Sequence, residues 1–153
     1  MNGIDVGVLR IMMGADAWDS DPTDGRLAYV DLSGANLLKD TEHSYNKFGV
    51  DEYLEKADWV GEYMFHNCTA LETLILPNSV TEIGENTFQG ATNLKRLAVG
   101  NGLKRYTRDL LQDIISGIDE LVFLTDEFAT SEKDDPWESI SPLCFDTSSP
   151  ATG

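Results

Sequence analysis

The residues best suited to acid–base or metal chemistry are few in this sequence. Histidine occurs only at His43 and His66. An imidazole can act as a general base or bind a metal, but either role requires further groups that converge on it. His66 stands where Gln89 stands 23 residues later in a repeat described below, which favours a polar surface position. We therefore predict no catalytic residue, metal ligand or cofactor, and no enzyme, since the chain also lacks a P-loop, a Rossmann glycine set, a C-x-x-C pair and a G-x-S-x-G motif.

The two cysteines, Cys68 and Cys144, permit one disulfide by parity. Cys68 occupies a repeat position that Ala91 fills in the next copy, which indicates a small buried slot. We expect a buried free thiol at Cys68, with a Cys68–Cys144 bond as the alternative.

An acidic stretch at residues 16–25 (DAWDSDPTDG) raises the question of calcium. An EF-hand loop requires acids at positions 1, 3 and 5, glycine at 6 and glutamate at 12. Counted from Asp19, position 5 is Thr23, Gly25 falls at 7 and position 12 is Val30. The spacing fails, so we predict a solvated turn, with a weak cation site as the alternative.

A repeated motif dominates the middle of the chain. Residues 60–82 and 83–105 are two copies of one 23-residue unit, the first with an L-x-x-L-x-L core and the second with valine at the last of these positions. Seven positions are identical, namely Gly61/Gly84, Glu62/Glu85, Phe65/Phe88, Thr69/Thr92, Leu71/Leu94, Leu74/Leu97 and Asn78/Asn101. A fixed period in the twenties is typical of stacked repeats that bury a shared core.

Strand periodicity indicates which side chains point inward. Alternation along a strand directs Leu74 and Leu76 to one side and Thr73 and Ile75 to the other. Successive copies would then pair as a parallel ladder, with a phenylalanine from a short helical turn closing the core opposite each strand. The predicted core consists of Val60, Phe65, Cys68, Leu71, Leu74, Leu76, Val80, Ile83, Phe88, Ala91, Leu94, Leu97, Val99 and Leu103.

The sequence of these copies resembles the BspA-type leucine-rich repeats of bacterial surface proteins. The matching residues are Val60, Gly61, Phe65, Cys68, Leu71, Leu74, Leu76, Pro77, Ser79 and Val80, in that order. The second copy departs at Ala91, Gly100 and Gly102, and the resemblance is weak after residue 124. It implies a right-handed leucine-rich-repeat solenoid of roughly four or five coils, with a parallel strand ladder on one face and short helices or turns on the other. It also implies a cell-surface or secreted location, and it specifies no ligand.

The rest of the chain divides around these repeats. Residues 1–26 predict an N-terminal cap: a helix over 2–14 with Val6, Leu9 and the two methionines Met12 and Met13 in the core, capped by Asn2 or Asp5 and ended by Gly14, followed by the acidic loop. Residues 27–126 carry the repeats, and 127–153 an acidic tail or C-terminal cap.

Within the repeat region the copies differ in clarity. The first strand falls at 27–37, and Leu27 lies 44 residues before Leu71, close to two periods, so a blurred coil is expected at 38–59. Within it, 41–49 predicts a projecting loop, and 50–59 predicts either a helical turn or a poor coil. A third copy at 106–126 aligns Tyr106 with Ile83 and, with one residue added, Leu121 with Leu97. Its segment 108–115 predicts a fuller helix.

Charge and hydropathy limit the partners. Asp and Glu number 27 against 11 Lys and Arg, a net charge of -16, which disfavours nucleic acid and anionic membranes. No apolar run of about 18 residues occurs, so no membrane insertion is expected. The start lacks a signal-peptide pattern, and we expect a trimmed piece of a longer precursor that acts as a monomer.

Two surface features are candidates for binding. The first is the outward stripe of the predicted strands: Tyr29, Asp31, Thr73, Ile75, Arg96, Ala98, Glu120 and Val122. The second is a basic island that would steer an acidic partner or, more simply, neutralise nearby carboxylates: Lys95, Arg96, Lys104, Arg105 and Arg108.

These features together predict a non-enzymatic, adhesion-type module that binds a protein partner along its strand face. The alternative is a structural spacer that displays another domain and has no ligand of its own.

Overall fold

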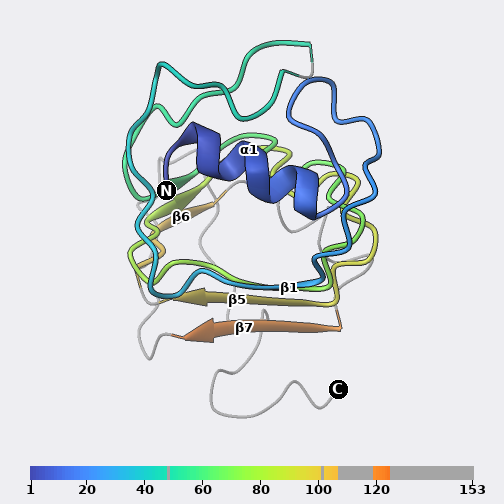
Figure 1. The fold of residues 1–153 in the computed structure, drawn as a ribbon. Helices are drawn as coiled ribbons and strands as arrows, with labels where there is room; N and C mark the ends of the chain where they lie inside the picture. The colour runs from blue at the N-terminus through green and yellow to red at the C-terminus, as the bar shows by residue number, and fades with distance from the viewer. Residues whose placement is uncertain (48, 101, 107–118, 125–153) are drawn as a thin grey trace.

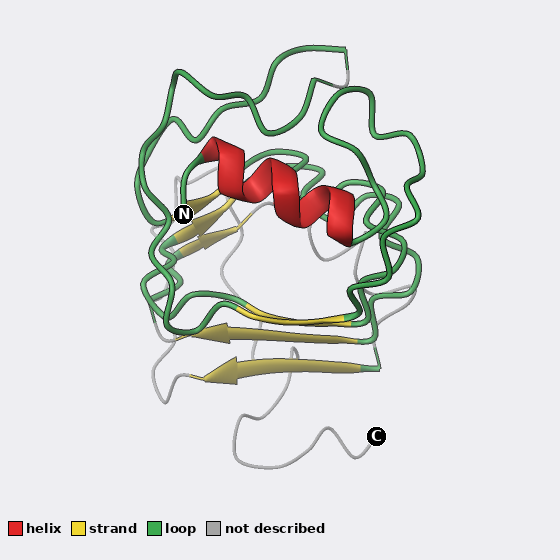
Figure 2. Cartoon of the chain, viewed as in Figure 1, coloured by secondary structure: helices red, strands yellow, loops and turns green. Residues whose placement is uncertain are grey.

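The computed structural model describes residues 1–47, 49–100, 102–106 and 119–124. These residues form one helix and two parallel sheets, one of four strands in the order β1-β3-β5-β7 and one of three in the order β2-β4-β6 (Figure 1). The elements are α1 (Gly3–Met12), β1 (Tyr29–Asp31), β2 (Trp59–Val60), β3 (Thr73–Ile75), β4 (Glu82–Ile83), β5 (Arg96–Gly100), β6 (Arg105–Tyr106) and β7 (Glu120–Leu124). Figure 2 shows that loops and turns make up the other described residues.

The sheet register confirms the repeat alignment. Leu74 pairs with Leu97 in the four-stranded sheet, and Val60 pairs with Ile83 in the three-stranded sheet. The third copy follows the same rule, because Ile83 pairs with Tyr106 and Leu97 with Leu121. Each 23-residue copy therefore contributes one strand to each sheet. The helix predicted at 108–115 and the tail at 127–153 lie outside the described residues.

The predicted core is present between the two sheets. The inward leucines of the first clear copy, Leu71, Leu74 and Leu76, are all fully buried, and their equivalents Leu94, Leu97 and Val99 are nearly so. Phe65 and Phe88 stack with ring centroids 5.5 Å apart. Each lies in a turn of its own copy, opposite the strand of the four-stranded sheet. The other predicted core residues are buried as well, except Ala91, which is partly buried.

The prediction that residues 38–59 form a further coil of the ladder is wrong. β1 pairs directly with β3, with Val30 opposite Leu74, so no strand lies between them. Residues 38–58 instead leave the stack as an excursion held by the isolated bridges Asp40↔Leu54 and Asn46↔Glu52. The physical reason is that this segment lacks the L-x-x-L-x-L pattern needed to fill a rung.

The few apolar side chains of the excursion serve as anchors rather than as a rung. Tyr45 and Leu54 are fully buried. The Tyr45 hydroxyl donates to the backbone carbonyl of Glu62, which ties the excursion to the first clear copy.

The predicted N-terminal helix is present, and it packs against the core cluster through Val6. Asn2 is the N-cap, and its side chain and that of Asp5 form a reciprocal capping box. Val6 and Met13 are buried, whereas Met12 is 46% exposed, so the prediction that both methionines lie in the core is wrong for Met12. Adjacent helical residues point about 100° apart, and here Met13 faces the core while Met12 faces solvent.

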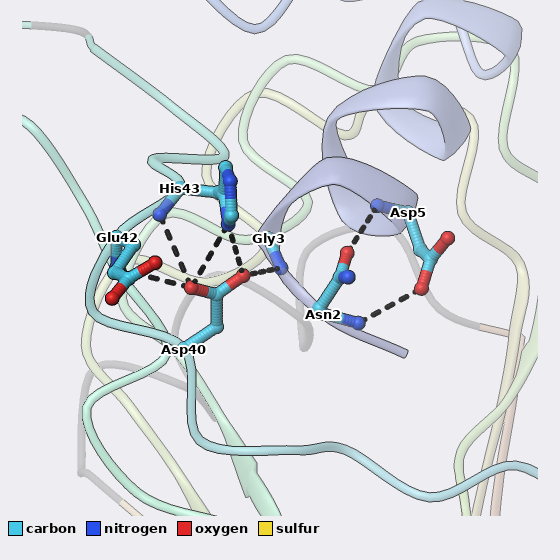
Figure 3. A network of polar contacts seen from close by, with 6 residues as sticks. All are labelled: Asn2, Gly3, Asp5, Asp40, Glu42 and His43. Atoms are coloured by element: carbon cyan, nitrogen blue, oxygen red, sulfur yellow. Dashed lines mark hydrogen bonds and ion pairs between the residues drawn. The ribbon is translucent and has the colours of Figure 1, made fainter.

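A carboxylate from the excursion secures the start of α1 (Figure 3). One Asp40 oxygen accepts from the Gly3 backbone N–H at 3.0 Å, and the other accepts from the backbone N–H groups of Glu42 and His43. The His43 Nδ1 lies 3.0 Å from the same carboxylate. Desolvation alone would raise the pKa of Asp40, but these hydrogen bonds outweigh it and lower the pKa to about 2. His43 thus belongs to a helix-anchoring contact.

Candidate functional site

The eight predicted binding residues lie in two rows across the four-stranded sheet. Register places Tyr29, Thr73, Arg96 and Glu120 in one row and Asp31, Ile75, Ala98 and Val122 in the other. Because side chains alternate along a strand, both rows lie on the side opposite the inward leucines. We call this surface the outer sheet face.

The first row is polar. Tyr29 is 57% exposed at the edge strand, and Thr73 is half-buried on its neighbour. The Arg96 Nε lies 2.9 Å from the Glu120 Oε2 and forms an ion pair with it, although its N–H is not aimed well enough to make a hydrogen bond. Both side chains are partly exposed, so this pair adds little stability. It does fix the direction of the guanidinium on the face.

The second row is apolar after Asp31. Ile75 and Val122 are half-buried, and Ala98 between them is only 3% exposed. Ala98 was predicted as a contact residue, but its single methyl group is almost completely buried and presents little surface to a partner. It lies outside the main core cluster, and by register it stands between Ile75 and Val122 in an apolar strip.

The basic island is only partly brought together in the described residues. Lys95 and Lys104 are exposed, and Arg96 is paired with Glu120. The side chain of Arg105 and all of Arg108 lie outside the description. The Arg96 contact supports charge neutralisation at that position.

A buried polar cluster behind α1 was not predicted. The Arg10 guanidinium is fully buried and donates at 3.0 Å to the backbone carbonyls of Tyr63 and Met64. It also donates to the Asp16 carbonyl at 3.0 Å and to the Ser20 hydroxyl at 2.7 Å. Burial lowers the Arg10 pKa from its usual value, but the ring of carbonyl dipoles holds the charge.

Ser20 joins this arginine to two more buried side chains. Its hydroxyl lies 3.2 Å from the Asn46 Oδ1 and 3.1 Å from the His66 Nδ1. His66 is 5% exposed, so the predicted surface position is wrong. The acidic loop folds over the turn that carries His66 and removes it from water. Desolvation, and then the neighbouring Arg10 charge, lower the pKa of His66 and favour the neutral ring.

A serine beside a histidine suggests nucleophilic catalysis, but this pair does not fit that role. The hydroxyl already contacts Arg10 and Asn46, and both Ser20 and His66 are almost completely buried. The cluster instead ties α1, the acidic loop, the excursion and a repeat turn together. One signal for it was present in the sequence, because Arg10 falls at helical spacing between Val6 and Met13 on the inward face.

The structure also shows the surroundings of Cys68 and of the acidic loop, the other two features that the sequence singled out. Cys68 is a fully buried free thiol, as expected, and desolvation raises its pKa to about 12, which makes it unreactive. Cys144 lies outside the described residues. The acidic loop forms a turn in which the Asp16 side chain accepts from the backbone of Trp18 and Asp19. No cluster of three or more potential metal-ligating side chains occurs in the part of the chain that the structure describes.

Glu52 makes the excursion sensitive to pH. Desolvation raises the Glu52 pKa to about 7, and the charges of Glu62 and Glu55 add to the effect. A group whose pKa is raised on folding binds its proton more tightly when folded, so stability falls as the pH rises from about 4.5 through about 7.

Glu52→Gln should therefore stabilise the protein at pH 8 and have little effect at pH 4. Urea unfolding followed by circular dichroism across this range measures the difference. Glu72→Gln, at an exposed position, is the matched control and should leave the shape of the profile unchanged. If the free energy of unfolding changed equally with pH in the wild type and in Glu52→Gln, the raised pKa would not belong to Glu52.

Among the described residues, none of the helices has the length and apolar character needed to cross a bilayer.

The geometry defines a class of protein. A parallel ladder with a 23-residue period and an inward L-x-x-L-x-L core is that of a leucine-rich-repeat protein. The family model described as BspA type leucine rich repeat region (6 copies) matches residues 51–127, which is half of the chain, and the chain belongs to this family. No curated protein and no solved structure matches the chain.

Proposed function

We propose that this chain is a non-enzymatic protein-binding module of the adhesion type, and that it contacts its partner through the outer sheet face. The observation that carries the proposal is the registered pair of rows across four parallel strands. A polar row beside an apolar strip offers hydrogen bonding and shape recognition together. The mixed character suits a protein surface better than a small molecule.

The repeat core supports this function by fixing the backbone beneath the face. Parallel strands lie about 4.8 Å apart, so the rows present side chains at a regular spacing. A surface held rigid by buried leucines loses little conformational entropy on binding. We propose that the copies continue as a right-handed solenoid, which extends the same face.

A cell-surface or secreted location and a monomeric state are part of the proposal. Family membership supports the location, because the resemblance is to bacterial surface proteins. The net charge of -16 supports solubility and opposes self-association.

A structural spacer is the second candidate function. It is favoured by the burial of Ala98 and by the Arg96–Glu120 pair, which leaves less of the face available to a partner. A spacer would bind nothing through this surface.

Binding measurements on immobilised chain separate the two functions. The chain is screened by biolayer interferometry against an array of host extracellular proteins, and any positive is retested with Tyr29→Ala and Arg96→Ala. Tyrosine and arginine are the residue types that most often dominate interfaces, so each change should weaken binding at least about tenfold. The control is Gln89→Ala on an exposed turn opposite the sheet.

Binding that survives both substitutions unaltered would remove the outer sheet face as the contact surface. An array without any positive would favour the spacer.

A further inference from the structure

The solvent side of α1 is unexpectedly apolar. Its outward residues Ile4, Val8, Ile11 and Met12 are 52%, 51%, 47% and 46% exposed. The inward side carries two glycines, Val6 and Arg10 instead. The outward residues follow the spacing i, i+4, i+7, i+8, which places them in one line along the helix. We call this line the α1 stripe.

A terminal cap normally presents a polar outer surface. Here the large apolar side chains lie outside while small residues and a buried cation face the core. Figure 1 shows α1 in front of the stack, where it crosses the end next to β1. A contiguous exposed apolar stripe on a soluble domain is typical of a binding surface.

Acidic groups stand at both ends of the α1 stripe. At the start of the helix, Asp5 is exposed, and Glu42 lies beside the Asp40 carboxylate that accepts from Gly3 (Figure 3). At the end of the helix, Asp24 is exposed and follows Thr23, whose hydroxyl donates to the Ile11 carbonyl.

Arg26 and Lys39 are exposed and adjoin Leu27 and Leu38, whose N–H groups donate to the carbonyls of Met12 and Met1. Together with the ammonium group of Met1, they offset part of this charge. The chain as a whole remains strongly negative, at -16. The field around the stripe therefore attracts positive charge.

We propose that the α1 stripe is a second binding surface, separate from the outer sheet face, and that it accepts a basic amphipathic helix of a partner protein. The i, i+4, i+7 spacing is the seam along which two helices pack side by side. Lysine or arginine flanking an apolar seam on the partner would meet the carboxylates at both ends of the stripe. A second copy of this chain carries the same acids, and anionic bilayers carry the same sign of charge, so both are repelled.

The experiment uses the full chain and synthetic helical peptides of about five turns. One peptide places leucines along a single face and lysines elsewhere; a second has the same composition in scrambled order; a third replaces every lysine by glutamate. Isothermal titration at about 0.15 M salt should detect binding of the first peptide only.

Two variants with the same change of charge locate the contact. Val8→Lys, on the α1 stripe, should weaken binding at least tenfold. Val50→Lys, on the excursion at a position 70% exposed, should leave it within twofold. Circular dichroism verifies that both variants fold. Tyr29→Ala, on the outer sheet face, should bind the peptide like the wild type, so a failure of the proposed function and a failure of this proposal can be told apart.

Equal binding of the scrambled or acidic peptide, or equal losses for Val8→Lys and Val50→Lys, would overturn the proposal. So would a dimer in sedimentation velocity that Val8→Lys converts to a monomer, because a second copy would then be the occupant of the stripe.

Discussion

Replacing Leu74 by alanine should lower the free energy of unfolding by about 2–5 kcal/mol. Leu74 is fully buried, and its backbone pairs with Val30 on one side and Leu97 on the other. The substitution therefore removes apolar surface from the centre of the ladder and leaves a cavity between neighbouring copies. Urea unfolding followed by circular dichroism gives the midpoint and the slope from which the change is calculated.

The matched control for Leu74→Ala is the adjacent Thr73→Ala. Thr73 lies on the outer sheet face and is half-buried, so its substitution should cost about 0.5 kcal/mol or less. Similar losses for the two variants would mean that alternation does not separate core from surface in this strand.

Replacing Arg10 by methionine should destabilise the protein by about 3–5 kcal/mol. Methionine fills much of the same volume, so the loss reports the missing hydrogen bonds rather than a cavity. The backbone carbonyls of Asp16 and Met64 lose the donor that Arg10 supplies, whereas the Tyr63 carbonyl still accepts from the His66 N–H. Each unsatisfied buried group costs about 1–3 kcal/mol.

Hydrogen exchange shows which part of the protein the Arg10→Met substitution loosens. We expect the amides of α1 to lose protection first, because Arg10 links the helix to the repeat turn at residues 63 and 64. Arg26→Met, at an exposed position, should leave both stability and exchange unchanged. An Arg10→Met protein as stable as the wild type would show that the guanidinium contributes no net stabilisation.

The repeat ladder could be predicted from sequence because its information is local and written twice. Leucines at fixed positions in copies 60–82 and 83–105 specify both the inward side and the strand register, and the pairing of Leu74 with Leu97 confirms this. The third copy could be aligned because Leu121 kept the same role after one added residue.

Other features depend on contacts that spacing does not encode. The interval between Leu27 and Leu71 was close to two periods, yet length alone does not show whether a segment forms a rung or leaves the stack. The cluster around Ser20 joins residues 10, 20, 46 and 66, which no repeat relates to one another. Alternation gave the side of the sheet on which Ala98 lies but not its exposure, which is only 3%.

The direct pairing of β1 with β3 has a practical use. The ladder closes across the excursion, so Val30 and Leu74 are neighbours although the intervening chain is long. The spacing of the rungs is therefore independent of how many residues the excursion holds. A foreign epitope or reporter peptide grafted beside the highly exposed Val50 would be displayed on a ready-made scaffold, with the registration of every rung preserved.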